Sequence, residues 1–529
     1  MAGNEYDYII VGAGSAGSTM AYRLGEDPTV KILVLEAGKP DNHMFIHMPA
    51  GVVNLAGSGQ FNWGYETEPQ AHCNNRRMYW PRGKTLGGSS SINAMLYIRG
   101  HAWDYDHWRQ LGNAGWSYAD VLPYFKRAQN NERGASEFHG SGGPLNVADQ
   151  RSPAKINDAF LAACEQAGHK RVTDFNGAEQ DGVGYYQVTQ KGGKRFSTAV
   201  GYLRPAMARG NVTVQTEAMT QKVLFENGKA VGVAYHHDKI DKAAYASREV
   251  ILSGGAINSP QTLMLSGIGP ADHLRSHHID VVADVPGVGG NLQDHIDAAT
   301  LYHCKTRDTY DTANELVTLA KYLFAKTGPG TSCIAETGGF LRTSDGLAAP
   351  DIQLHFIPAF VIDHGKTKMK TNGMTLHMCL LRPESRGTIR LKSPDPLDHP
   401  AIDANYLAEQ RDIDVLVKGT KMAREIFAQK AMEPYRGEEM EPSASRRSDA
   451  EITDWIRARC ETIYHPVGTC KMGADSDPMA VVDNELRVRG VKGLRVVDAS
   501  VMPTLVGGNT NAPTIMIAER VSDLMRKAA

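Results

Sequence analysis

The sequence predicts an α/β protein, in which a domain on a parallel sheet carries an inserted α+β domain built on an antiparallel sheet. The first forty residues combine two apolar strands, a helix and a glycine-rich turn. Apolar runs at residues 249–253 and 494–498 resume the same strand pattern far along the chain. Between about residues 300 and 460, shorter alternating segments are separated by Pro and Gly turns. At 529 residues the chain is too long for a single hydrophobic core.

The N-terminal segment has the order strand, helix, strand. Residues 8–11 and 31–35 are short apolar runs, typical of buried strands, and residues 19–24 favour a helix between them. A helix that joins two neighbouring strands in this way predicts a parallel sheet with one face covered.

The turn after the first strand has Gly-x-Gly-x-x-Gly spacing. Gly12 permits the tight turn, Gly14 lets backbone approach a pyrophosphate, and Gly17 lets the helix pack against the strand. Glu36, at the end of the second strand, can accept hydrogen bonds from both ribose hydroxyls and would repel a 2′-phosphate, which disfavours NADP. These features predict a Rossmann-type dinucleotide-binding domain, but they do not distinguish FAD from NAD.

The middle of the chain predicts the inserted domain. Residues 351–358, 374–380 and 387–392 alternate in the way expected of antiparallel strands with one covered face. We therefore expect the chain to leave the first domain and return to it. The expected segments are residues 1–150 (first part of the cofactor domain), 151–200 (bridging segment of the substrate domain), 201–300 (second part), 301–464 (substrate domain) and 465–529 (C-terminal part).

Composition narrows the class of protein and its partners. The formal net charge of −2 offers no electrostatic basis for binding nucleic acid. Seven scattered cysteines with no C-x-x-C pair favour a reducing compartment over a disulfide framework or a metal site. No signal peptide is evident, and no run approaches the ~20 apolar residues of a spanning helix. We expect a cytoplasmic protein without a metal, and peripheral contact with the inner face of the cytoplasmic membrane stays open.

A second glycine-rich run, RGKTLGGSSSIN, occupies residues 82–93. Backbone N–H and hydroxyl groups there suit a loop pressed against a flat ligand with polar edges. The run resembles the first signature of the glucose–methanol–choline oxidoreductase family. Residues 255–269 resemble the second signature, except at Thr262, where an aliphatic residue is usual. Residues 286–295 and 464–470 match further family blocks, so the resemblance extends over the whole chain.

This resemblance implies a flavoenzyme that binds FAD. Ile92 stands where some members have a histidine bonded covalently to the flavin, so we expect non-covalent FAD. The expected cofactor site comprises Gly12, Gly14, Ser15, Ala16, Gly17, Glu36, Ala37, Arg82, Thr85, Leu86, Gly87, Gly88, Ser89, Asn93, Ala94, Met95, Trp116, Val223, Asp498, Ala499, Asn509, Thr510 and Asn511.

The resemblance also implies a catalytic pair, His465 and Asn509. Oxidation of an alcohol requires removal of the hydroxyl proton, transfer of the α-hydrogen as hydride to flavin N5, and a partner for the developing alkoxide. A neutral imidazole suits the proton near pH 7, and a side-chain amide suits the oxygen. Asn511 precedes Pro513 and an expected helix over residues 515–525, so it is also a candidate turn or cap residue.

The substrate is less constrained by the sequence. Ile463 and Ala94 are apolar candidates near the catalytic pair, and Glu336 and His355 are candidates from the inserted domain. Within the family, the chain is most similar to alcohol dehydrogenases of bacterial alkane degradation. That similarity implies an aliphatic primary alcohol as substrate and a quinone or other non-nicotinamide acceptor for the electrons. Choline and polyethylene-glycol dehydrogenases are also similar, and Glu336 can supply the carboxylate that a quaternary ammonium requires.

Other functions stay open on the sequence alone. The family contains oxidases that use oxygen, and flavin-dependent hydroxynitrile lyases whose reaction involves no net redox change. A dinucleotide-binding regulator without catalysis is a further alternative, although the intact His465 and Asn509 pair disfavours it.

Overall fold

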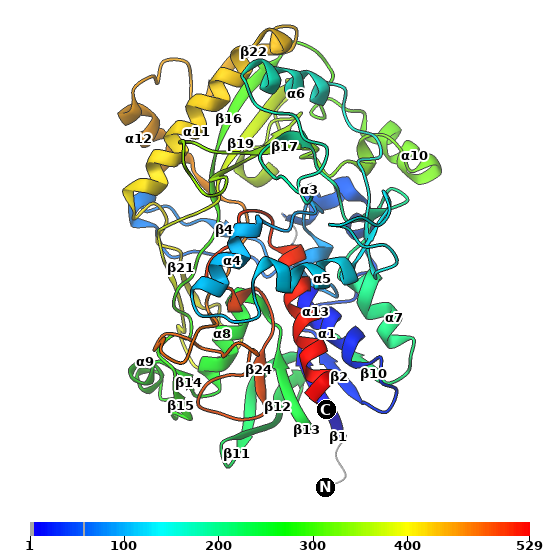
Figure 1. Cartoon of the computed structure of the whole chain (residues 1–529), viewed down its shortest axis with the longest axis vertical. Coiled ribbons are helices and arrows are strands. Elements are labelled where there is room, and N and C mark those ends of the chain that lie inside the picture. Colours follow the sequence, from blue (N-terminus) through cyan, green and yellow to red (C-terminus); the bar gives the residue numbers. More distant parts are fainter. Residues whose placement is uncertain (1–4, 57–58, 529) are drawn as a thin grey trace.

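The computed structural model describes residues 5–56 and 59–528. It divides into two sheet-based halves, one above the other in Figure 1. The lower sheet has the strand order β10-β2-β1-β13-β12-β11, and β24 pairs with β13. Its strands are β1 (Glu5–Val11), β2 (Ile32–Leu35), β10 (Val212–Gln215), β11 (Met219–Glu226), β12 (Lys229–His237), β13 (Ile240–Leu252) and β24 (Leu494–Val496).

The pairing of this lower sheet confirms the expected strand–helix–strand unit. Strands β10, β2, β1, β13 and β24 are parallel, while β12 and β11 extend the sheet as an antiparallel edge. Val11 is in register with Leu35 and Leu252, and Leu252 with Val496, so these strands end at one edge. The carboxyl edge of such a sheet is where α/β proteins bind ligands.

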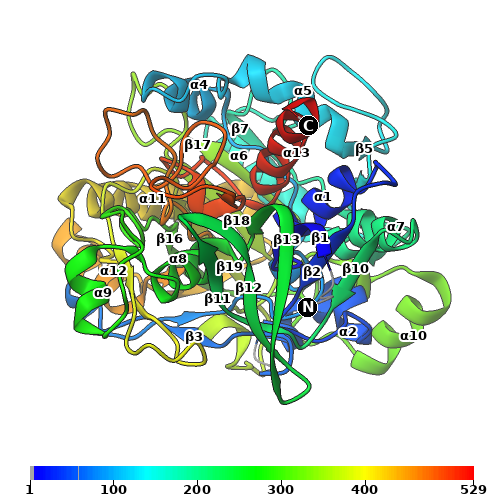
Figure 2. The ribbon, with the colours of Figure 1, turned by 90° about the horizontal axis from the view of Figure 1, so that it is seen from below.

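Helices cover this sheet and begin at the same edge. Helix α1 (Ser15–Leu24) follows β1 directly and starts four residues before the expected helix. Helix α13 (Asn511–Ala528) runs beside α1, as Figures 1 and 2 both show. It also begins four residues earlier than expected, so Asn511 is its first residue. Helix α8 (Gly255–Leu265) follows β13 in the same way.

The upper sheet is antiparallel throughout. Its order is β22-β16-β19-β18-β17-β7, and β23 pairs with β16. Its strands are β7 (Gly182–Tyr185), β16 (Ile296–Cys304), β17 (Thr337–Leu341), β18 (Ile352–Ile357), β19 (Gly373–Leu380), β22 (Arg436–Glu441) and β23 (Glu461–Thr462). This sheet spans the segments predicted for the substrate domain, whose exact boundaries stay predictions.

Two expectations about this sheet were wrong. Strands β18 and β19 are buried on both faces, so the alternation does not mark a solvated face. Helices α6 (Ile156–Gln166) and α11 (Gln410–Ala428) cover one face, where Phe356 stacks on Phe160 at 4.3 Å between ring centroids. Residues 387–392 do not belong to this sheet, because β20 (Thr388–Arg390) pairs separately with β21 (Ala401–Asp403).

The remaining helices and strands lie outside the two large sheets. The remaining helices are α2 (Met44–His47), α3 (Val52–Ala56), α4 (Ala102–Gln110), α5 (Tyr118–Ala128), α7 (Arg204–Met207), α9 (Ala271–Ser276), α10 (Glu315–Ala325) and α12 (Asp449–Arg459). The remaining strands are β3 (Tyr65–Glu66), β4 (Tyr79–Trp80), β5 (Gln129–Asn131), β6 (Leu145–Val147), β8 (Gln190–Lys191), β9 (Lys194–Arg195), β14 (Ile268–Gly269) and β15 (Ala283–Asp284). No helix in residues 5–56 and 59–528 has the length and apolar character needed to cross a membrane.

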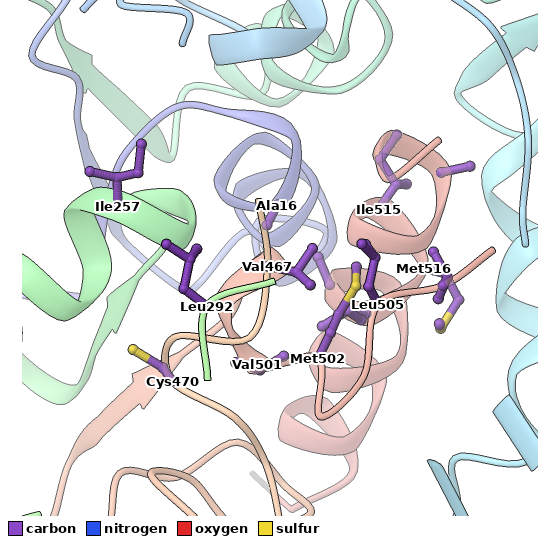
Figure 3. Packing of buried hydrophobic residues seen from close by; sticks show 14 of the residues in the cluster. Ala16, Ile257, Leu292, Val467, Cys470, Val501, Met502, Leu505, Ile515 and Met516 are labelled. Carbon is purple, nitrogen blue, oxygen red and sulfur yellow. The ribbon is translucent and has the colours of Figure 1, made fainter. Parts of the chain in front are cut away.

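The C-terminal segment packs into the core of the lower half. Figure 3 shows Val467 and Leu505 among buried apolar side chains that also include Ala16 of α1 and Ile515 of α13. Each of these side chains is at most a few per cent exposed. Close packing at Val467 and Leu505 anchors the two loops that carry His465 and Asn509.

Candidate active site

A cavity of about 1160 Å³ is lined by residues of both halves. One part, which we call the cofactor part, is lined by the carboxyl edge of the lower sheet and includes Gly12, Glu36 and Gly88. The other, which we call the catalytic part, is lined by His355 of β18 together with His465 and Asn509. The volume suits a large cofactor together with a small substrate.

The two glycine motifs meet in the cofactor part. A Cβ atom at Gly17 would lie 1.9 Å from the Gly12 carbonyl oxygen, and one at Gly12 would lie 2.5 Å from that of Ser253. At Gly14, by contrast, the nearest atom to an added Cβ is the Gly88 Cα, at 3.9 Å. Gly12 and Gly17 are therefore required by the fold itself, whereas Gly14 leaves open space on the cavity side, as close approach of a pyrophosphate requires.

Glu36 lies at the predicted place at the end of β2. Its carboxylate accepts hydrogen bonds from the backbone N–H groups of Ala13 (2.9 Å) and Gly38 (2.8 Å). Burial raises the pKa of this carboxyl to about 7, although the two N–H donors act in the opposite direction. Each oxygen keeps a further lone pair for a hydroxyl donor, so the geometry fits the expected ribose contact.

The second glycine run packs directly on the first. The Gly87 N–H donates to the Ala13 carbonyl at 2.8 Å, and Thr85 donates its hydroxyl to the Lys39 carbonyl at 2.7 Å. Thr85, Leu86 and Gly87 thus connect the motifs and do not line the cavity. The residues of this region that do line it are Arg82, Gly83, Gly88, Ser89, Ile92, Asn93, Ala94, Met95 and Leu96.

Two helix N-termini face the cavity. Ser15 and Ala16 of α1 and Asn511 and Thr514 of α13 line it, and the Ser15 hydroxyl donates to Asn511 Oδ1 at 2.6 Å. Helix N-termini present unpaired N–H groups and a positive dipole end, which favour anionic groups. With the open space at Gly14, these donors fit a dinucleotide such as FAD.

Asp498 organises the edge of the cavity beside α8. Its carboxylate accepts hydrogen bonds from the Gly255 N–H (2.8 Å), the Ser259 hydroxyl (2.5 Å) and the Ser500 N–H (2.8 Å). Asp498, Ala499 and Thr510 all line the cavity, as expected for cofactor residues.

Trp116 and Val223 lie outside the cavity, although both were expected to contact the cofactor. The Trp116 indole donates to the Asn484 carbonyl at 3.1 Å and stacks under the Arg520 guanidinium. Val223 is buried in β11, and its N–H donates to the Ser266 hydroxyl at 2.9 Å. Both side chains are satisfied by core packing, which makes them structural in this fold.

His465 and Asn509 meet in the catalytic part. His465 Nε2 and Asn509 Nδ2 are 3.2 Å apart, although the residues are far apart in sequence. Burial lowers the pKa of His465 well below its usual range, and the neighbouring His295, His355 and Arg82 lower it further. The imidazole is therefore neutral near pH 7, as a general base requires.

A chain of hydrogen bonds determines which nitrogen of His465 is free. His295 Nε2 lies 3.2 Å from the Leu381 carbonyl, which only accepts, so this nitrogen carries a proton. Burial lowers the pKa of His295 to about 3, so the ring is neutral and its Nδ1 is an acceptor. His465 Nδ1 lies 2.9 Å from His295 Nδ1 and must donate to it. The lone pair of His465 is then on Nε2, which faces Asn509.

The backbone of His465 and the amide of Asn509 are held separately. Asp294 accepts the His465 N–H at 2.7 Å, and its other oxygen accepts the Thr462 hydroxyl at 2.5 Å. The Asn509 side-chain oxygen accepts a hydrogen bond from Gln353 Nε2 at 3.2 Å. This bond orients the Asn509 NH₂ group toward His465.

Three of the four candidate substrate residues line the cavity, and the fourth does not. Ile463, Ala94 and His355 line the cavity. Within the described residues, neither ring nitrogen of His355 has a hydrogen-bond partner, and burial lowers the pKa of this side chain to about 3. Glu336 does not line the cavity. Its carboxylate accepts hydrogen bonds from groups of the surrounding fold, namely Ala154 N, Asn157 Nδ2, Tyr310 OH and Ser332 Oγ.

Sequence reasoning missed the residues that hold the pair. Asp294 and His295 end the family block at residues 286–295, but nothing in that block indicated contact with His465. Gln353 alternates with His355 on β18, and this period of two was the available signal that both share a face.

The chain is similar to known proteins over nearly its whole length. Two models described as GMC oxidoreductase match residues 6–297 and 383–518. The alcohol dehydrogenase [acceptor] of Pseudomonas putida is 48% identical over 98% of this chain and 95% of its own length. The mitochondrial choline dehydrogenase of Mus musculus is 47% identical over 99% of this chain and 90% of its own. The crystal structure of pyridoxine 4-oxidase from Mesorbium loti has a TM-score of 0.89 at 31% identity and covers 99% of both chains.

Proposed function

The chain belongs to the GMC oxidoreductase family, and we propose that it oxidises an aliphatic primary alcohol to the aldehyde with FAD as cofactor. The observation that carries the proposal is the pairing of His465 Nε2 with the Asn509 amide at 3.2 Å in the cavity. When bound, FAD supplies the acceptor for the hydride that leaves the alcohol carbon.

Each side chain of the site has a separate role in the reaction. His465 Nε2 takes the hydroxyl proton, because its lone pair lies toward Asn509, which lines the cavity, and its ring is neutral. The Asn509 NH₂ group donates to the oxygen as negative charge develops there. His355 adds a second donor, since its unpartnered imidazole lines the same part. The protonated His465 keeps its bond to His295, so it does not turn away.

The cofactor is held without a covalent bond. Ile92 lines the cavity and offers no atom that can bond to a flavin. Binding instead depends on backbone N–H groups at Ser15 and Ala16, on Glu36, and on the N-terminus of α13.

An apolar wall supports an aliphatic substrate. Apolar residues that line the cavity include Ala94, Met95, Ile334, Ala335, Ile357, Val361 and Ile463. Choline is the second candidate, because a choline dehydrogenase is 47% identical to this chain. Glu336, the expected partner of a quaternary ammonium, is already bonded to the surrounding fold, which favours the uncharged alcohol.

Electrons from the reduced enzyme then pass to a quinone or another non-nicotinamide acceptor. The 48% identical relative from Pseudomonas putida is an alcohol dehydrogenase [acceptor], which supports this assignment. Because a quinone is dissolved in the membrane, we also propose that the protein is cytoplasmic and contacts the membrane surface peripherally.

The test is an anaerobic titration of the purified yellow protein with a medium-chain primary alcohol, followed by air. Bleaching by the alcohol, with slow return of colour in air, is the expected result. Rapid return would indicate an oxidase. Bleaching by choline but not by the alcohol would favour the second candidate. No bleaching by either, with release of cyanide from a cyanohydrin, would replace the proposal with a lyase.

A further inference from the structure

Helix α10 exposes apolar side chains on its solvent side. The exposed fractions of the side chains are 90% for Phe324, 79% for Leu316 and 50% for both Leu323 and Val317. The helix projects from the edge of the molecule, as both views show (Figures 1 and 2). Scattered apolar side chains on a surface are ordinary, but four on one helix form a patch that water solvates poorly.

The helix is nevertheless well anchored at its inner side. Tyr322 is only 5% exposed, and its hydroxyl donates to the His47 carbonyl at 3.1 Å. Asn314 caps the helix by accepting the Val317 N–H at 3.0 Å. The orientation of α10 is therefore set by the fold, and its apolar side faces outward as a consequence.

Lysines lie beside the apolar side chains. Lys366, Lys368 and Lys370 are exposed in the loop after residue 365, and Lys368 reaches Glu315 of α10 at 3.7 Å. Lys321 adds another exposed ammonium on the helix itself. Two acids here are also exposed: Glu315 of α10, and Asp363 just before the loop, whose carboxylate accepts the Thr367 hydroxyl at 2.7 Å. We call Leu316, Val317, Leu323, Phe324 and these four lysines the apolar–lysine patch.

The patch borders a place where the cavity reaches the surface, because Glu315 and Lys368 are exposed and also line the cavity. Glu315, Thr318 and Leu319 of α10 line the cavity, and so do Thr367, Lys368 and Met369 of the lysine loop. Molecules that enter the catalytic part along this side pass between the helix and the loop. The apolar side chains that are exposed therefore lie next to the entrance.

We propose that the apolar–lysine patch docks α10 on a membrane surface that contains anionic phospholipid, so that the cavity entrance faces the lipid. This inference rests on the proposed function and specifies which surface of the protein makes the peripheral contact with the membrane. Apolar side chains of an amphipathic helix insert below the headgroups, and neighbouring lysines attract lipid phosphates. An apolar alcohol or quinone would then reach the cavity without crossing bulk water.

Charge favours lipid over a second copy of the chain. A two-fold symmetric contact through α10 would bring the lysines of both copies to one interface, where like charges repel. A phosphate-bearing surface has the opposite charge. A projecting helix also inserts into a soft surface more readily than it forms a flat protein contact.

The test measures co-sedimentation of the FAD-loaded protein with vesicles of equimolar phosphatidylcholine and phosphatidylglycerol at low salt. Leu316→Ser with Phe324→Ser is expected to weaken binding at least about tenfold, because two large apolar side chains no longer leave water. Lys321→Gln with Lys370→Gln is expected to weaken it about tenfold on these vesicles and to have little effect on pure phosphatidylcholine.

Matched controls remove similar groups elsewhere. Ile240→Ser with Leu397→Ser replaces side chains that are 58% and 71% exposed, and Lys239→Gln with Lys430→Gln removes two exposed lysines. Both control pairs should bind like the unaltered protein. Equal binding by the α10 pair would overturn the proposal, as would failure of the unaltered protein to bind. Loss of a dimer in the α10 pair, with vesicle binding unchanged, would assign the patch to a second copy.

Catalysis is followed separately in solution. A short water-soluble alcohol and a soluble dye acceptor test the proposed function without any membrane. All variants should keep this activity, because none of the altered side chains lines the cavity. A protein that binds vesicles but oxidises no alcohol would leave the docking proposal standing and refute the proposed function.

Discussion

The cofactor part of the cavity is shaped mainly by backbone, whereas the catalytic part is shaped by side chains from distant segments. In the cofactor part, Gly14 and Gly88 bring two backbone turns together, and helices α1 and α13 point their N-termini at the space. In the catalytic part, His295 and Asn509 contact His465 from separate segments, and Gln353 of β18 bonds Asn509.

This difference predicts that substitutions in the two parts of the cavity have different effects. A backbone-lined surface tolerates no added atom where turns touch, since the obstruction is the main chain itself. A substitution in a side-chain network leaves the protein folded, but it lowers activity when it removes one of the hydrogen bonds on which the chemistry depends. The following substitutions distinguish the two parts, from the largest expected effect to the smallest.

His465→Ala should lower kcat/KM by about a thousandfold or more while FAD stays bound, because general bases contribute about 10²- to 10⁴-fold. The measurement is anaerobic flavin reduction by the alcohol, with the flavin absorbance per protein as the control. Unchanged reduction would refute the assignment of the base. Loss of FAD would show that the two parts of the cavity are not independent.

Gly17→Ala and Gly14→Ala should act on different properties. The added methyl at Gly17 would lie 1.9 Å from the Gly12 oxygen, so the free energy of unfolding should fall by about 3 kcal/mol or more. At Gly14 the nearest atom is 3.9 Å away, so the protein without cofactor should keep its melting temperature and bind FAD more weakly. Thermal unfolding with and without FAD measures both. Equal destabilisation by the two substitutions would contradict the geometry.

His295→Leu should lower kcat/KM about ten- to a hundredfold, because His465 Nδ1 would lose its acceptor and its tautomer would no longer be selected. His295→Asn is the matched variant, since an amide oxygen can accept the same proton. Rescue by Asn supports a positioning role for His295. If both variants lose activity equally, the tautomer argument fails.

The pH dependence should show a base with a low pKa. Burial holds the pKa of His465 well below the ordinary value of 6.5, so the side chain stays neutral as the pH falls through that value. Protonation in stronger acid then removes the base and activity declines. A profile of kcat/KM against pH measures this directly. A decline centred above the ordinary histidine value would show that the buried ring is charged in the free enzyme.

The sequence alone determined the features that depend on a short stretch of chain. The glycine turn, the strands on either side of α1, and Glu36 all lie within one strand–helix–strand unit, where spacing dictates backbone geometry. The family blocks also identified His465 and Asn509, whose proximity the structure then showed.

Other expectations failed because a residue type does not reveal its neighbours. The alternation in residues 351–358 suggested one solvated face, but that face carries His355, which lines the cavity, and Gln353, which bonds Asn509. Glu336 looked available for a ligand, yet the surrounding fold uses its carboxylate. Trp116 and Val223 are held in the core in the same way.

Only the tertiary structure decided how the proposed catalytic pair, His465 and Asn509, is held and oriented. The Leu381 carbonyl selects the tautomer of His295, His295 selects that of His465, and Gln353 orients Asn509. None of these contacts is local in sequence, because each forms when the upper sheet packs against the loops of the lower half. Local backbone geometry is encoded in a few adjacent residues, whereas hydrogen-bond roles in a buried site depend on whatever packing brings within about 3 Å.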